Sequence, residues 1–210
     1  AANNVAAIGE KVDSKRKLPE ANAAVPQSAN LIAPPPPLAP DGWLTLFDGA
    51  RLYDCELPSE AISAKKVRVE DGILRLENIR LFFRTHGKDA SIRVVVKKIS
   101  GQHMDIGLRW ELKKSSYAAF FNGGDYFGIG GHVKEKWHDI QSVNLKRKYD
   151  DFFEMTLTAR GKDVTLDVNG KTIIQVEDDG ANGDGVFFVT AWRGVSLFKK
   201  IEVKLLDKKP

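Results

Sequence analysis

The feature that most restricts the fold of this sequence is an alternation of apolar and polar residues that runs from about Trp43 to the C-terminal end. In the segment 104–110, Met104, Ile106 and Leu108 recur at every second position, which is the period of a β-strand with one buried face. Glycine-containing turns separate such segments, and no segment after residue 41 sustains a helical period. About a dozen short strands in this arrangement predict an all-β fold, an antiparallel jelly-roll β-sandwich.

The first 40 residues differ in composition from the rest of the chain. They are rich in Ala, Asn and Pro and end in the run LIAPPPPLAP. Such a run favours an extended polyproline II conformation without a packed core. We therefore predict a flexible linker over residues 1–40 and one β-sandwich domain over residues 41–210. The linker is interpreted as a solvated tether, with a docking segment for an aromatic-grooved partner domain as the alternative.

Charge and cysteine content exclude several classes of protein. The chain has 32 basic and 28 acidic residues, with a formal net charge of +4. The lysines are scattered rather than gathered in a stripe, so we expect no nucleic-acid partner. The single cysteine, Cys55, excludes an internal disulfide framework. No apolar run has the length of a membrane span, and the chain begins with Ala, so we expect an excised piece whose targeting or membrane segment would lie upstream.

Aromatic residues are the most suggestive candidates for a binding site. The apolar faces of sugars stack on aromatic rings, while Arg, Asn and Asp side chains bind the hydroxyl groups. Trp110 and Trp192 occupy alternating strand positions, and we interpret them as core residues. Arg109 lies between Leu108 and Trp110, so its side chain is expected to face away from the core. The predicted sugar-binding surface consists of four residues: Arg109, Asn122, Tyr126 and Trp137.

The sequence shows no complete catalytic motif. Hydrolysis of a glycosidic bond usually requires two carboxyl groups about 5 to 9.5 Å apart. Glucanases with a sandwich fold carry them in an E-x-D-x-x-E strand, which is absent from this sequence. The acidic residues nearest to the aromatic-rich centre are Glu111, Asp125 and Asp139. They are weak catalytic candidates, because most carboxylates of this kind are surface groups.

Metal-binding signals are weak, and we predict no metal site or required cofactor. His132 and His138 lie on one strand face by alternation, but their spacing is not that of a tight ligand pair. The acidic segment VEDDGANGDG, residues 176–185, lacks the ligand order of an EF-hand. A turn-rich loop is the favoured interpretation of this segment, and a calcium site built from several loops is the alternative.

Several short motifs resemble one known family in order and spacing. Four segments carry the resemblance: GWLTLFDGARLYDC (42–55), VRVEDGILRLEN (67–78), VNGKTIIQVEDD (168–179) and GVFFVTAWRGVSLFKKIEVKLL (185–206). They resemble the 3-keto-disaccharide hydrolase-type domain family. The central segment, residues 105–131, is more similar to laminin-G-like and concanavalin A-like lectin and glucanase domains. It departs from the family's central strand, in which acidic and amide groups line the cleft.

The resemblance implies a concanavalin-like jelly roll that binds or cleaves carbohydrate, usually bacterial and exported. On that basis we expect a glycan-binding module in the periplasm or at the cell surface, tethered to a larger protein. Two alternatives remain open, a glycoside hydrolase that cleaves 3-keto-glycosides and a protein–protein interaction module.

Overall fold

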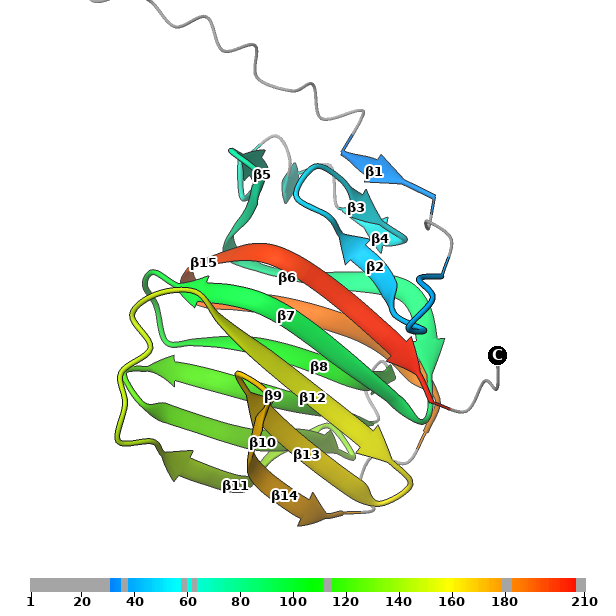
Figure 1. Cartoon of the computed structure of the whole chain (residues 1–210), viewed down its shortest axis with the longest axis vertical. Helices are drawn as coiled ribbons and strands as arrows, with labels where there is room; N and C mark the ends of the chain where they lie inside the picture. Colours follow the sequence, from blue (N-terminus) through cyan, green and yellow to red (C-terminus); the bar gives the residue numbers. More distant parts are fainter. Residues whose placement is uncertain are drawn as a thin grey trace, which may run out of the picture.

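The computed structural model describes residues 31–34, 38–57, 60–61, 64–111, 115–178 and 183–206. Within these ranges the chain is almost entirely β-structure (Figure 1). The strands are β1 (Ile32–Ala33), β2 (Leu44–Phe47), β3 (Leu52–Tyr53), β4 (Cys55–Glu56), β5 (Val67–Glu70), β6 (Ile73–Gly87), β7 (Ala90–Lys98), β8 (His103–Glu111), β9 (Ser115–Gly123), β10 (Tyr126–Val133), β11 (Lys136–Asn144), β12 (Phe153–Arg160), β13 (Asp163–Val168), β14 (Lys171–Glu177) and β15 (Gly185–Leu205).

The strands form two packed layers, which share the long strand β15. In the first layer the order is β11-β10-β9-β8-β15, and in the second it is β15-β7-β12-β13-β14. The first half of β15 pairs with β8 and its second half with β7, and between them the pairing of β15 with β6 is irregular from Ala191 to Val195. In Figure 1, β12 and β13 cross in front of β8 to β10. The predicted antiparallel β-sandwich is confirmed.

The core lies between the layers and is built by alternation. Met104, Ile106 and Leu108 of β8 are fully buried, as are Ile92 and Val94 of β7. Burying such a side chain contributes about 1.5–3 kcal/mol relative to leaving it exposed, which is an upper estimate of its contribution to the free energy of folding. The opposite faces of the same strands are left available for a surface function.

A short strand precedes the predicted domain boundary. Ile32 and Ala33 form β1, which pairs in parallel with β3, and the Leu52 amide donates to the Leu31 carbonyl at 2.8 Å. Residues 31–34 therefore contact the sandwich, and the predicted boundary at residue 41 stays a prediction. The predicted linker residues 1–30 lie outside the described residues.

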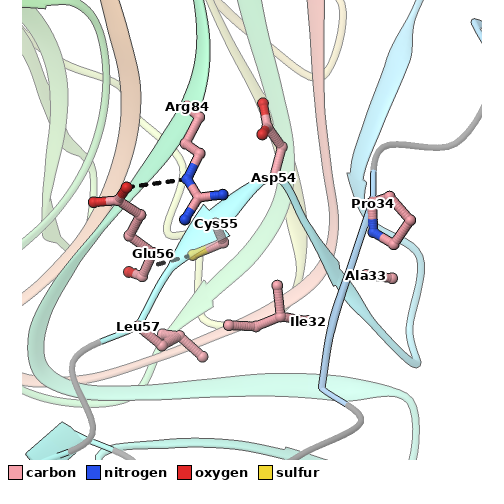
Figure 2. Close-up of a pocket in the computed structure, with 8 residues that line it drawn as sticks. All are labelled: Ile32, Ala33, Pro34, Asp54, Cys55, Glu56, Leu57 and Arg84. Carbon is pink, nitrogen blue, oxygen red and sulfur yellow. Dashed lines mark hydrogen bonds and ion pairs between the residues drawn. The ribbon is translucent and has the colours of Figure 1, made fainter.

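A hollow of about 620 Å³ separates β1 from β4 and β6 (Figure 2). The Arg84 guanidinium donates to the Glu56 carboxylate at 3.0 Å on one side, and Ile32 and Leu57 supply apolar surface on the other. Cys55 faces this hollow from a buried position, and burial raises the pKa of its thiol to about 12. Because the thiolate is the reactive form, we expect this buried thiol to react slowly in the folded state.

Candidate functional site

The outer face of the first layer carries aromatic rings that lie directly over glycine backbones. A Cβ atom at Gly130 would lie 2.3 Å from the Trp137 indole, and one at Gly128 would lie 2.2 Å from the Phe120 ring. The missing side chains allow these rings to lie flat against the sheet. Each ring then covers backbone with one face, and Trp137 remains 42 % exposed. The glycines of β10 thus create a platform rather than a turn.

These rings border a groove of about 360 Å³ on the same face. That volume is within the range of small-molecule sites. Its lining comes from β6, β8, β9, β10, β11 and β15. The lining residues are Arg80, His103, Asp105, Phe120, Asn122, Tyr126, His132, Trp137, Asp139 and Trp192.

One side of the groove is an aromatic cluster anchored by a carboxylate. The Trp137 indole nitrogen donates to the Asp139 carboxylate at 2.7 Å, which fixes the orientation of the ring. The Phe120 ring centroid lies 6.2 Å from that of Trp137 and 6.1 Å from that of Tyr126. The three rings form a continuous apolar surface with polar groups at its edges.

The other side of the groove contains a histidine held by a buried carboxylate. His103 Nδ1 lies 2.6 Å from Asp105 Oδ1, and Asp105 is only 3 % exposed. A carboxylate accepts hydrogen bonds, so this contact places the imidazole proton on Nδ1. The His103 ring stacks on Trp192, with centroids 6.0 Å apart. The second exposed indole of the groove is therefore also held in a defined orientation.

Arg80 provides the positive charge of the groove. Its Nε donates to the Thr190 hydroxyl at 2.9 Å, and its guanidinium carbon lies 4.8 Å from the ring centroids of both Trp110 and Phe188. Burial lowers the pKa of the guanidinium, and the charge of Asp105 opposes that shift. Within the described part of the chain its terminal amino groups make no hydrogen bond to protein. They are available to a ligand.

We expect His132 to titrate below its ordinary pKa of 6.5, because burial and then the charge of Arg80 disfavour its protonated form. The unfolded chain takes up this proton more readily, so His132 contributes stability that is present above 6.5 and is lost as the pH falls through its folded pKa. An NMR titration of the imidazole resonances measures this value. Arg80→Met should raise the His132 pKa part of the way toward 6.5. A folded pKa at or above 6.5 contradicts the expectation.

The structure brings together four of the seven predicted site residues. Asn122, Tyr126, Trp137 and Asp139 all line the groove. The other two acids lie elsewhere: Asp125 occupies the turn between β9 and β10, and Glu111 lies at the end of β8. The binding and catalytic roles of these residues remain predictions.

The expectation that Arg109 faces outward is wrong. Its backbone has a φ of 56° at an irregularity in the β8–β9 pairing, which reverses the alternation and directs the side chain inward. The side chain is fully buried. Its guanidinium donates to the carbonyl oxygens of Lys88 and Gly161 and to Asp89, so it joins β8 to two turns of the sandwich. Its position is that of a structural residue.

The interpretation of two tryptophans as core residues is also wrong, for Trp110 because of the same irregularity. Trp110 turns to the outer face, where it contacts Arg80 and Phe188. Trp192 is 44 % exposed and lines the groove. Sequence reasoning also missed Arg80, His103, Asp105 and His132 as groove residues, and the alternation of β8 could have identified His103 and Asp105.

Metal and membrane features are sparse in the part of the chain that the structure describes. There, no group of three or more His, Cys, Asp or Glu residues is arranged to hold a metal ion. Residues 179–182 of the acidic segment considered for calcium lie outside the described residues. No described helix has the length and apolarity needed to span a membrane.

Comparison with solved structures identifies the fold. No protein-family model matches the sequence, and no curated protein sequence matches it. The chain is similar in structure to the carbohydrate-binding module CBM66 of Bacillus subtilis, with a TM-score of 0.55 and 14 % identity over 78 % of this chain and 95 % of that module. It is also similar to the β-glucanase of Bacillus licheniformis, with a TM-score of 0.58 and 9 % identity over 77 % of this chain and 91 % of that enzyme.

A third similar structure is a β-1,3-1,4-glucanase, or lichenase, from a mouse hindgut metagenome. Its TM-score is 0.58 at 12 % identity, over 68 % of this chain and 85 % of that enzyme. Identities this low establish the fold and nothing finer. The chain therefore has the concanavalin-like jelly-roll fold that the sequence predicted.

Proposed function

We propose that this protein binds carbohydrate in the groove on the outer face of the first layer. The observation that carries the proposal is the pair of held, half-exposed indoles, Trp137 and Trp192, in one groove. A ring fixed with one face against the protein and the other toward solvent presents a flat apolar surface at little entropic cost. Such surfaces match the apolar faces of sugar rings.

The polar groups of the groove support the same function. The Asn122 amide and the Tyr126 hydroxyl make no hydrogen bond to other described residues, nor do the terminal amino groups of Arg80. Asp139 accepts from the Trp137 indole and retains further acceptor capacity. Donors and acceptors without protein partners, arranged around aromatic rings, suit a ligand that carries many hydroxyl groups. Two of the similar structures are glucanases and one is a carbohydrate-binding module, which supports the proposal at the level of fold.

Hydrolysis is the second candidate, because two carboxylates, Asp105 and Asp139, line the groove. Asp139 of β11 pairs with Gly130, which pairs with Ala118, which in turn pairs with Gly107 of β8. Gly107 lies two residues from Asp105. Three strand steps of ~4.8 Å separate their backbones by about 14 Å across the sheet. Glycosidases require carboxyl groups about 5 to 9.5 Å apart. Each carboxylate is also engaged by another side chain, Asp105 by His103 and Asp139 by Trp137, which favours binding over hydrolysis. Hydrolysis of 3-keto-disaccharides remains a proposal that rests on the sequence resemblance.

Proton NMR of the full chain with a panel of oligosaccharides and 3-keto-disaccharides tests both functions together. Saturation transfer to a sugar without new anomeric signals is expected for a binding protein. New anomeric signals would instead show hydrolysis. Trp137→Ala should remove saturation transfer, whereas Trp43→Ala, which removes an indole from the opposite layer beside Arg93, should not. If no sugar shows transfer, the proposal fails and a protein partner for the exposed aromatic groove becomes the better hypothesis.

A further inference from the structure

The two exposed indoles of the groove stand on strands that are far apart in the sheet. Trp137 belongs to β11 and Trp192 to β15, and the intervening order is β10, β9 and β8. Four strand spacings of ~4.8 Å separate these two backbones by about 19 Å across the sheet. Along the strands they are also offset, because the pairing register aligns Trp137 with the region of Val186 in β15, about six residues from Trp192, so the line between the two indoles runs diagonally over the strands. The Trp137 ring leans inward over Gly130, so the separation of the ring faces is smaller, but the two indoles make no ring contact with each other.

The space between the indoles is lined without interruption. The Trp137 ring adjoins Phe120, and Phe120 pairs in register with Asp105 of β8. Asp105 holds His103, whose ring stacks on Trp192. Aromatic surface therefore stands at both ends of the groove, and hydrogen-bonding groups of Asp105 and His103 stand between them.

The charges of the groove limit the kind of sugar that it accepts. Asp105 and Asp139 bring two carboxylates, and Arg80 brings one guanidinium. The lowered pKa of His132 keeps that imidazole neutral near neutral pH. A negatively charged sugar would therefore meet the Asp139 carboxylate beside the aromatic rings, where like charges repel. The balance favours an uncharged ligand.

We infer that the groove binds an uncharged linear oligosaccharide of at least tetrasaccharide length, which lies across the strands from Trp137 to Trp192. This inference rests on the proposed carbohydrate binding and specifies its ligand class. Each pyranose ring adds to an oligosaccharide a length roughly equal to the spacing between neighbouring strands. A disaccharide therefore reaches only one indole. A tetrasaccharide spans the groove and stacks on both.

A size series tests the inference. Isothermal titration of the full chain is carried out with laminari-, cello-, xylo- and manno-oligosaccharides, each as the disaccharide, the tetrasaccharide and the hexasaccharide. Oligogalacturonides of the same lengths form the charged series. For the linkage that binds, the tetrasaccharide should bind at least about tenfold more tightly than the disaccharide, and the hexasaccharide should add little.

Two variants connect the length dependence to the two rings. Trp137→Ala and Trp192→Ala should each weaken tetrasaccharide binding by up to about tenfold, and either variant should bring it close to the disaccharide affinity. A disaccharide that binds as tightly as the tetrasaccharide, or an effect confined to one tryptophan, overturns the inference and leaves the proposed function in place. Tighter binding of oligogalacturonides overturns the uncharged ligand class. Failure of every sugar in the series to bind removes the proposed function as well.

Discussion

Arg109→Met is expected to lower the free energy of unfolding by about 3 kcal/mol, mainly the cost of leaving buried hydrogen-bond acceptors without a partner. The guanidinium is fully buried, and its loss removes the donor to the carbonyl oxygens of Lys88 and Gly161 and one of the donors to Asp89. Methionine retains a long side chain and carries a Cβ atom, as arginine does. The strain of the positive φ of 56° is therefore the same in both proteins. The difference in stability therefore reports the guanidinium and not the backbone.

Urea unfolding followed by tryptophan fluorescence measures this effect. Arg193→Met is the matched control, because Arg193 also has a positive φ, of 50°, but is exposed. Its substitution should change stability by less than about 0.5 kcal/mol, as is usual for surface positions. The folded fraction of Arg109→Met should still bind sugar. A stable Arg109→Met protein that has lost sugar binding would restore Arg109 as a ligand-binding residue and contradict its structural assignment.

The error over Arg109 shows where sequence periodicity stops being informative. Alternation predicted the strand correctly, because Met104, Ile106 and Leu108 are all buried. It failed one residue later, where the irregular pairing after Leu108 moves Arg109 into the core and Trp110 onto the surface. A bulge adds a residue to one strand and shifts every following side chain to the other face. Neither Arg109 nor Trp110 is a residue type that would indicate a bulge rather than a regular strand in the sequence.

A different ambiguity concealed Trp192. In β15 both faces are apolar, since Phe187, Val189 and Ala191 point into the core while Phe188 and Trp192 point outward. When both faces of a strand are apolar, the sequence alternation fits either face as the buried one. Only the pairing with neighbouring strands then decides which face is buried. The groove residues also come from six strands, of which β8 to β11 are consecutive in the sequence while β6 and β15 are not. The aromatic candidates on the adjacent strands β10 and β11 could be predicted, whereas Arg80 of β6 could not.

Gly130→Ala is expected to reduce sugar affinity about as much as Trp137→Ala, although residue 130 has no side chain to contact a ligand. A Cβ atom there would lie 2.3 Å from the Trp137 indole and 2.9 Å from the His138 carbonyl oxygen, so the ring must leave its flat position. We expect about a tenfold loss of affinity, the size of one aromatic contact, and about 1–3 kcal/mol of destabilisation from overpacking.

A double-mutant cycle separates the ring from the backbone as the cause. Once Trp137 is replaced by Ala, the ring is gone, and Gly130→Ala should then cost little further affinity. Titration of the single and double variants with the same tetrasaccharide gives the coupling directly. If the losses of affinity from the two single substitutions instead add in full, the alanine at position 130 acts by displacing β11 at His138. The effect of Gly130 on sugar binding would then not depend on the orientation of the Trp137 indole. Strong coupling would show that a backbone position with no side chain sets the orientation of the sugar platform.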